Sequence, residues 1–221
     1  MEELKTTYFN DLKIAFNERV YEPKEDSFLL ANAVEEKDIN GKACLDIGTG
    51  CGIQAINLAS KRAKTVLAVD INEEALKIIE LNARKLGFEN IQTRKSNLFE
   101  NVKEKFDLIV FNPPYLPSEK IEEKALDAGL KGRKFIDEFL KELKGHLKEN
   151  GRAFFLQSSL NGEEKTKKKL KELGLKGKVV ARERFFFEEI MVFLAGKPST
   201  RSAIFRGFLR EQKSSSQDKV M

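Results

Sequence analysis

The sequence is poor in the residues that bind metal ions or form disulfide bridges. It contains one histidine, His146, and two cysteines, Cys44 and Cys51, among its 221 residues. A structural zinc site needs about four Cys or His ligands, and a disulfide framework needs several cysteine pairs. We therefore predict neither a metal site nor a disulfide framework, and we interpret His146 as a surface residue on a helix.

Long apolar segments are absent as well. The longest apolar runs have the length of a β-strand, far below the ~20 residues that cross a bilayer, and residues 1–5 lack the basic and apolar regions of a signal peptide. We therefore expect a cytoplasmic protein. Its 221 residues, of which 41% are hydrophobic and 34% charged, fit one domain with a sizeable core. The formal net charge of +5 permits an acidic or nucleic-acid partner without requiring one.

Strand-length apolar runs alternate with helical patterns along the chain. The expected parallel strands are residues 43–47, 65–69, 91–96, 106–111 and 152–158. Helical spacing of apolar residues marks 53–59, 73–86 and 134–147, with Gly87 ending the second helix and Asn150-Gly151 the third, and a Lys-rich helix follows. Residues 178–184 and 189–195 fit a closing antiparallel hairpin. This alternation predicts an α/β fold with a doubly wound, mostly parallel sheet of seven strands.

Ligand sites in such sheets lie at the carboxyl ends of the strands. The first strand is followed by Gly48-Thr49-Gly50-Cys51-Gly52, whose glycines let the backbone turn sharply and approach a ligand closely. Asp46 lies just before this loop, and Asp70 follows the second strand, where its carboxylate can accept both hydroxyls of a ribose. Dinucleotide oxidoreductases and S-adenosylmethionine (SAM) methyltransferases share these two features, so the features alone leave both classes open.

The fourth strand ends in Phe111-Asn112-Pro113-Pro114-Tyr115. Two prolines remove two backbone donors and stiffen the chain where an amide side chain and an aromatic ring are placed. Together with the glycine loop, this stretch resembles the (N/D)PP(Y/F/W) motif of SAM-dependent methyltransferases that modify planar amino or amide nitrogens. The resemblance favours methyl transfer over hydride transfer.

A third motif, Tyr21-Glu22-Pro23-Lys24-Glu25-Asp26-Ser27-Phe28-Leu29-Leu30, narrows the resemblance. It is similar to the YEPxED(S/T)FLL stretch of the HemK-like release-factor glutamine methyltransferases, in their archaeal and eukaryotic branch. The resemblance extends from about residue 20 to residue 195. It implies a Rossmann-like methyltransferase domain over residues 1–196, which uses SAM to methylate the glutamine side chain of the Gly-Gly-Gln motif in a class-1 release factor. Residues 197–221, which are basic and contain several serines, are expected to form a flexible tail.

The same resemblance implies roles for individual residues. Asn112, Pro113 and Tyr115 match the catalytic motif. The positions that match the family's contacts to SAM are Ser27, Asp46, Gly48, Thr49, Gly50, Asp70, Ile71, Asn97, Leu98 and Asn112. Two departures stand out: the family commonly has Asp where this chain has Asn97, and residues 125–133 match the family's glycine-rich loop without its frequent Trp and one Gly.

The chemistry of an amide nitrogen accounts for the residues of the catalytic motif. Such a nitrogen is a poor nucleophile because its lone pair is delocalised into the carbonyl group. The side-chain oxygen of Asn112 can accept one N–H and the Pro113 carbonyl the other, which aims the lone pair at the methyl group. Tyr115 can pack against the planar amide. Because Asn carries no charge, the site needs no strong base.

The resemblance further implies a partner, because archaeal and eukaryotic members of the family pair with a small zinc-ribbon activator subunit. Fewer than two dozen residues precede Glu22-Pro23, too few for the helical domain that bacterial members carry there. Residues 91–95 are predicted to be an exposed edge strand to which a second chain could add. Direct nucleic-acid binding is not expected. Three alternatives stay open: methylation of adenine N6 or guanine N2, methylation of a protein lysine, and a non-catalytic scaffold.

Overall fold

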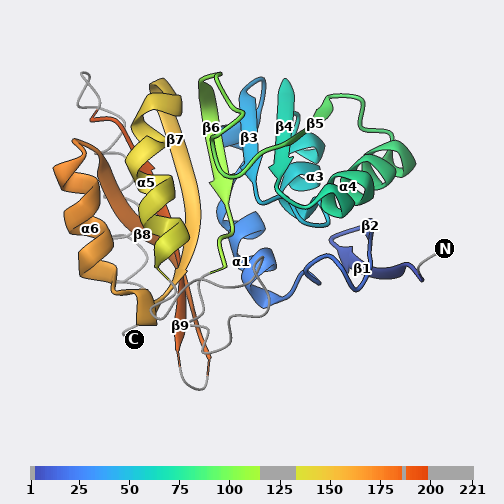
Figure 1. The fold of residues 1–221 in the computed structure, drawn as a ribbon, viewed down its shortest axis with the longest axis horizontal. Helices are drawn as coiled ribbons and strands as arrows, with labels where there is room; N and C mark the ends of the chain where they lie inside the picture. The colour runs from blue at the N-terminus through green and yellow to red at the C-terminus, as the bar shows by residue number, and fades with distance from the viewer. Residues whose placement is uncertain (1–2, 115–132, 186–187, 199–221) are drawn as a thin grey trace, which may run out of the picture.

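The computed structural model describes residues 3–114, 133–185 and 188–198. Within these ranges the chain forms a seven-stranded sheet in the order β5-β4-β3-β6-β7-β9-β8 and a separate two-stranded sheet near the N-terminus (Figure 1). The strands of the large sheet are β3 (Ala43–Ile47), β4 (Thr65–Asp70), β5 (Ile91–Lys95), β6 (Phe106–Phe111), β7 (Leu147–Ser158), β8 (Lys176–Arg184) and β9 (Glu189–Gly196). Strands β3 to β7 run parallel, and β9 is antiparallel to both of its neighbours. The predicted mostly parallel sheet and its closing hairpin are confirmed.

Three helices connect parallel strands in the described ranges: α3 (Ile53–Ser60), α4 (Glu73–Leu86) and α5 (Lys134–His146). Helices α1 (Glu25–Ala33) and α2 (Glu36–Ile39) precede β3, and a 3-10 turn η1 (Ser159–Asn161) and helix α6 (Glu163–Glu172) lie between β7 and β8. The chain leaves β3 toward β4 and β5 and later returns to the other side of β3 as β6, so the strand order reverses at β3. This reversal is where doubly wound sheets bind ligands. No helix in the described ranges is both long and apolar enough to cross a membrane.

A row of phenylalanines fixes the end of β6 in the core. The ring centroids of Phe111 and Phe139 are 4.9 Å apart, those of Phe139 and Phe155 5.5 Å, and those of Phe155 and Phe193 5.3 Å. All four rings are buried. Each such aromatic pair contributes about 0.5 to 1.5 kcal/mol beyond the burial of its area. Because Phe111 directly precedes Asn112, this packing fixes the strand end from which the catalytic motif begins.

The predicted end of the third helix, at Asn150-Gly151, was wrong. α5 ends at His146 and β7 begins at Leu147, so Asn150-Gly151 lies within the strand. The register of β7 against β6 shifts at this place, between Phe106 and Leu108. A Cβ atom on Gly151 would lie 2.7 Å from the carbonyl oxygen of Phe106, so only glycine allows the two backbones to approach this closely. The Asn-Gly pair therefore marks a strand irregularity and not a helix end.

His146 lies at the end of α5 and is partly exposed, as expected of a surface residue on a helix. Its ring stacks on Phe99 with the centroids 4.2 Å apart, and its Nδ1 lies 3.1 Å from the carbonyl oxygen of Glu104. Phe99 thus covers one face of the ring. Among the residues that the structure describes, no group of three or more His, Cys, Asp or Glu side chains is placed to hold a metal ion.

An N-terminal hairpin, β1 (Lys5–Phe9) and β2 (Leu12–Phe16), was not predicted. Asn82 of α4 joins it to the glycine loop. Its Oδ1 accepts the N–H of Ala15 at 2.9 Å, and its Nδ2 donates to the carbonyl oxygens of Ala15 and Cys51 at 2.8 and 2.9 Å. One buried amide therefore satisfies three backbone groups and connects the hairpin, α4 and the loop after β3.

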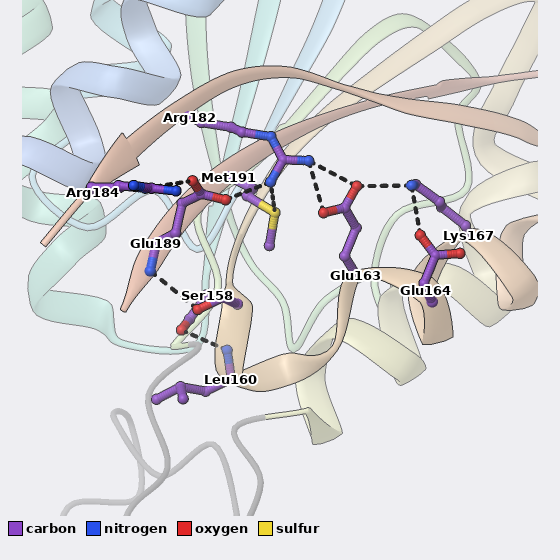
Figure 2. A network of polar contacts seen from close by, with 10 residues as sticks. Ser158, Leu160, Glu163, Glu164, Lys167, Arg182, Arg184, Glu189 and Met191 are labelled. Carbon is purple, nitrogen blue, oxygen red and sulfur yellow. Dashed lines mark hydrogen bonds and ion pairs between the residues drawn. The ribbon is translucent and has the colours of Figure 1, made fainter. Parts of the chain in front are cut away.

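Charged side chains attach the C-terminal hairpin to α6. Figure 2 shows Arg182 of β8 between Glu163 of α6 and Glu189 of β9, with Lys167 on the far side of Glu163. The guanidinium donates to both carboxylate oxygens of Glu163, at 2.8 and 2.7 Å. Both of these hydrogen bonds come from the same nitrogen, Nη2, and the side chain of Arg182 is 40% exposed, so water screens the interaction. We expect these ion pairs to orient the hairpin β8–β9 relative to α6 and to add little to the free energy of unfolding.

Candidate active site

The carboxyl ends of β3, β4 and β6 meet at one edge of the sheet. Ile47 pairs with Val69 on one side and with Phe111 on the other. The residues that come next along each strand are therefore neighbours: the glycine loop after β3, Asp70 at the end of β4 and Asn112 after β6. The structure thus brings together three of the segments in which the sequence placed its candidate site.

The glycine loop is held against the end of β4. Gly48, Gly50 and Gly52 have φ values of 62°, 55° and 88°, which lie in the left-handed region that glycine adopts without strain. The N–H of Thr49 donates to the carbonyl oxygen of Val69 at 3.0 Å, and the N–H of Gly50 donates to Asp70 Oδ2 at 3.0 Å. These bonds fix the loop where a ligand would cross the sheet edge.

The Gly52→Ala substitution is expected to lower the free energy of unfolding by about 2 to 4 kcal/mol. A Cβ atom there would lie 2.0 Å from Ile79 Cδ1, in addition to the strain of a positive φ. Gly87→Ala is the matched control, because Gly87 has a φ of 75° and nothing within 4 Å of the added atom. The control should lose only about 1 to 2 kcal/mol. Urea unfolding of both variants checks this, and equal losses would show that contact with Ile79 is unimportant.

Asp46 lies beneath the loop with 1% of its surface exposed. Its Oδ2 accepts the hydroxyl of Thr49 at 2.7 Å and the N–H of Ala55 at 3.0 Å. Burial raises the pKa of Asp46 to about 7, although these two hydrogen bonds act to lower it, and the nearby charge of Asp70 raises it further. The hydroxyl of Thr49 is thereby engaged with Asp46 inside the protein.

Asp70 is the second carboxylate of the site. Its Oδ2 accepts the N–H of Gly50, and its Oδ1 accepts the N–H of Asn72 at 2.9 Å. Burial raises its pKa, while the backbone hydrogen bonds from Asn72 and Gly50 oppose the rise. The next residue, Ile71, has 57% of its surface exposed and forms an apolar patch beside the carboxylate.

The turn after β5 contributes Asn97 and Leu98. Leu98 is buried and has a φ of 48°, an uncommon conformation for a residue with a side chain, and its carbonyl oxygen accepts the hydroxyl of Ser96 at 2.9 Å. Asn97 is exposed. Both therefore lie on the next strand end beyond Asp70, as expected from the order of the strands.

Asn112 has an oriented side chain. Its Nδ2 donates to Asp26 Oδ2 at 3.1 Å and to the hydroxyl oxygen of Ser27 at 3.3 Å. Its Oδ1 is buried and has no hydrogen-bond partner among the described residues. Pro113 is buried, and Tyr115 lies outside the described residues, as do residues 125–132 of the predicted glycine-rich loop. The site therefore offers one unused acceptor atom.

Asp26 is the residue of this site that was missed. It is 4% exposed, in the first turn of α1, and its Oδ1 accepts the N–H of Ser27 at 2.6 Å and the hydroxyl of Tyr21 at 3.2 Å. Burial, followed by the charge of Asp26, raises the pKa of Tyr21. Both residues belong to the motif 21–30, which carried the signal, but the contact between Asp26 and Asn112 joins positions 86 residues apart. Only the folded chain shows that contact.

Comparison with known proteins places the chain in a family. Residues 22–187 match the family described as the methyltransferase small domain. A protein of Methanocaldococcus jannaschii named as a protein N5-glutamine methyltransferase is 46% identical over 83% of this chain and 95% of its own length. The human methyltransferase HEMK2 is 33% identical over 72% of this chain and 80% of its own length. This chain belongs to the methyltransferase small domain family.

Other similarities are more partial. The release factor glutamine methyltransferase of Buchnera aphidicola is 37% identical over 53% of this chain, which spans only 43% of that relative's length. The solved E. cuniculi Mtq2-Trm112 complex, described as methylating the eRF1 translation termination factor, contains a chain that is 26% identical, with a TM-score of 0.66 over 81% of this chain and 99% of that one. The sequence resemblance to the HemK-like methyltransferases is confirmed.

Proposed function

We propose that this protein uses SAM to methylate the glutamine side-chain amide of the Gly-Gly-Gln motif in a class-1 release factor, in the cytoplasm. The observation that supports this best is the unpartnered oxygen of Asn112, which is held at the end of β6. It lies at the same sheet edge as the glycine loop and the buried carboxylates of Asp46 and Asp70. The name of the Methanocaldococcus jannaschii relative, a protein N5-glutamine methyltransferase, agrees with a methyl acceptor of this kind.

The strand ends fit a cationic donor that carries an adenosine. The carboxylate of Asp70 accepts backbone N–H groups from Gly50 and Asn72, and its two oxygens have further lone pairs with which to accept the hydroxyls of a ribose. The exposed side chain of Ile71 offers an apolar surface for the adenine ring, and Asn97 and Leu98 lie on the adjoining strand end. SAM supplies an activated methyl group on a positively charged sulfur. The buried carboxylate of Asp46 favours such a cation at this edge.

Asn112 and its neighbours would position the acceptor. Nδ2 of Asn112 donates to Asp26 and Ser27, and Oδ1, the acceptor atom of the amide, is left to accept a hydrogen bond from a glutamine amide N–H. Pro113 is buried next to it and restricts how the backbone can move there. Orientation of this kind can account for several kcal/mol of a reaction barrier. Tyr115 is proposed as a wall against the planar amide.

The acceptor class is tested with methyl-labelled SAM and separate incubations with a class-1 release factor, duplex DNA and RNA. Label is expected in the release factor alone, and a factor whose Gly-Gly-Gln glutamine is replaced should stay unlabelled. Label in nucleic acid would instead support methylation of a nucleobase amine. Equal labelling of both factors would point to another protein residue such as lysine.

We also propose a zinc-ribbon subunit as partner, with β5 as the place where it attaches. Within the part of the chain that the structure describes, β5 is an edge strand of the sheet and pairs only with β4. The N–H of Ser96 donates to the carbonyl oxygen of Asp70 in β4. Because backbone groups alternate in direction along a strand, the N–H of Thr93 then faces away from β4 and is available to a strand of a second chain.

Thr93→Pro is expected to weaken binding of the subunit by at least about tenfold, because it removes a donor of the open edge without breaking a bond to β4. Thr93→Val is the matched control. Both variants lose the hydrogen bond from the Thr93 hydroxyl to Glu80, but valine keeps the backbone N–H. Titration calorimetry with the purified subunit compares them. Unchanged binding by the proline variant would place the partner elsewhere on the molecule.

A further inference from the structure

The side-chain amide of Asn112 is held between two acceptors. Asp26 presents a carboxylate oxygen 3.1 Å from Nδ2, and a carboxylate only accepts hydrogen bonds. Ser27 has a single hydroxyl hydrogen, which it donates to Asp26 Oδ1 at 3.2 Å, so its oxygen faces Asn112 as an acceptor. Both neighbours therefore require the nitrogen of the Asn112 amide and reject its oxygen.

Rotation of the Asn112 amide by half a turn would be costly for this reason. Oδ1 would then face the carboxylate of Asp26 and the lone pairs of Ser27, and Nδ2 would lose both acceptors. In the observed orientation Oδ1 is buried and unpartnered, which by itself costs about 1 to 3 kcal/mol. The protein therefore keeps an unsatisfied acceptor in place, as expected for an atom that meets its partner only when a ligand binds.

Asp26 is itself fixed in position. Its Oδ1 accepts the N–H and the hydroxyl of Ser27 and the hydroxyl of Tyr21. It lies in the first turn of α1, where the helix dipole favours a negative charge. Gln54 of α3 holds the same helix by donating to the carbonyl oxygen of Ser27 at 2.8 Å. The carboxylate thus has little freedom to follow a change in the Asn112 side chain.

We propose that Asp26 is a positioning residue, which sets the direction of the Asn112 amide so that its oxygen faces the acceptor nitrogen of the substrate. The proposal rests on the proposed function of this site and deepens it. Asp26 acts through Asn112 and does not touch the reacting atoms. Replacing such a residue should lower turnover. The size of the loss should depend on which two side chains occupy positions 26 and 112 together.

Exchange of the two side chains tests this. Asp26→Asn removes the preference for one orientation of the Asn112 amide and should lower kcat by about tenfold or more, with the KM for SAM changed by less than about threefold. Asn112→Asp places two carboxylates about 3.1 Å apart, and such a pair holds a shared proton. Its residual activity should therefore fall as pH rises and that proton is lost.

The double variant Asp26→Asn with Asn112→Asp should be more active than Asn112→Asp alone, by about fivefold or more, and should lose the new pH dependence. In it the amide at position 26 donates to the carboxylate at 112, which keeps one oxygen free as an acceptor. A merely structural link between α1 and β6 would give no recovery and no change of pH profile. Wild-type turnover in Asp26→Asn, or a double variant no better than Asn112→Asp, would overturn the proposal.

Nuclear magnetic resonance of the wild-type side-chain amides covers the case in which a variant does not fold. One N–H of the Asn112 amide should be shifted downfield and exchange slowly, and Ser27→Ala should leave that signal because Asp26 remains. A freely exchanging Asn112 amide would overturn the proposal. Since this readout needs no substrate, it separates failure of the proposal from failure of the proposed function, which would appear as a wild-type protein that does not methylate the factor.

Discussion

Replacing Asn112 by alanine is expected to lower kcat for methylation of the release factor by about a hundredfold or more, while the Kd of SAM changes by less than about threefold. The variant removes a buried, unpartnered oxygen at the end of β6, which would otherwise accept a glutamine N–H. SAM contacts from Asp70 and the glycine loop stay in place. Single-turnover transfer and calorimetry measure the two quantities separately.

Asn57→Ala is the control for this substitution. Asn57 is also a buried asparagine with an unpartnered Oδ1, and its Nδ2 donates to the carbonyl oxygen of Ala31 at 2.9 Å. It lies within α3, away from the end of β6. Its loss should reduce stability and leave turnover near the wild-type value. If Asn57→Ala and Asn112→Ala lowered turnover equally, the effect at position 112 would be one of stability and not of catalysis.

The second large effect is expected at Asp46. Burial raises the pKa of its carboxyl to about 7, so the group is neutral below that pH and charged above it. A charged Asp46 attracts the cationic SAM, and the affinity for SAM should therefore rise as pH increases through about 7, by up to about tenfold per pH unit below the pKa. Asp46→Asn should bind SAM more weakly at pH 8 and lose this dependence. Calorimetry at several pH values checks both.

The raised pKa of Asp46 also makes the free energy of unfolding of the ligand-free protein depend on pH. The pKa of Asp46 is higher in the folded protein than its usual value of about 3.9, so folding favours the protonated form. The wild-type protein should therefore lose stability between about pH 4 and pH 7, and the loss persists above pH 7. Asp46→Asn removes this cost and should be more stable than wild type at pH 8 by roughly 1 to 4 kcal/mol.

Urea unfolding at pH 4 and pH 8 measures this difference, which should nearly vanish at the lower pH. Thr49→Val supplies a further control, because it removes a hydrogen bond that lowers the pKa of Asp46. The pH at which SAM affinity rises should then move upward. An Asp46→Asn variant that binds SAM with unchanged affinity and unchanged pH dependence would show that this carboxylate does not face the cation.

The sheet and its ligand edge were predictable because they depend on local patterns. Buried parallel strands are short apolar runs, and α4 has both its end signals: Asn72 caps its start by accepting the N–H of Glu74, and Gly87 ends it with a positive φ. The glycine loop, Asp70 and Asn112 directly follow such strands. Once the strands were assigned, the meeting of these residues at one edge followed from the topology.

Features that depend on distant contacts were not predictable. The N-terminal hairpin has mostly exposed residues in β1, and a single amide from α4, that of Asn82, completes its bonding. The Asn150-Gly151 pair looks like a helix end, and only its closeness to Phe106 shows why glycine is needed there. Asp26 belongs to a motif, but its effect on Asn112 follows from the direction of two side chains.

The account is tested most directly by locating the methyl group. The wild-type protein, with its subunit, is allowed one turnover on a class-1 release factor, and tandem mass spectrometry then assigns the modified residue. We predict a single methyl group on the side-chain nitrogen of the Gly-Gly-Gln glutamine, and none when Asn112→Ala replaces the wild type. A methyl group on any other residue, or the same product from Asn112→Ala, would contradict the assignment of Asn112 as the group that holds a glutamine amide.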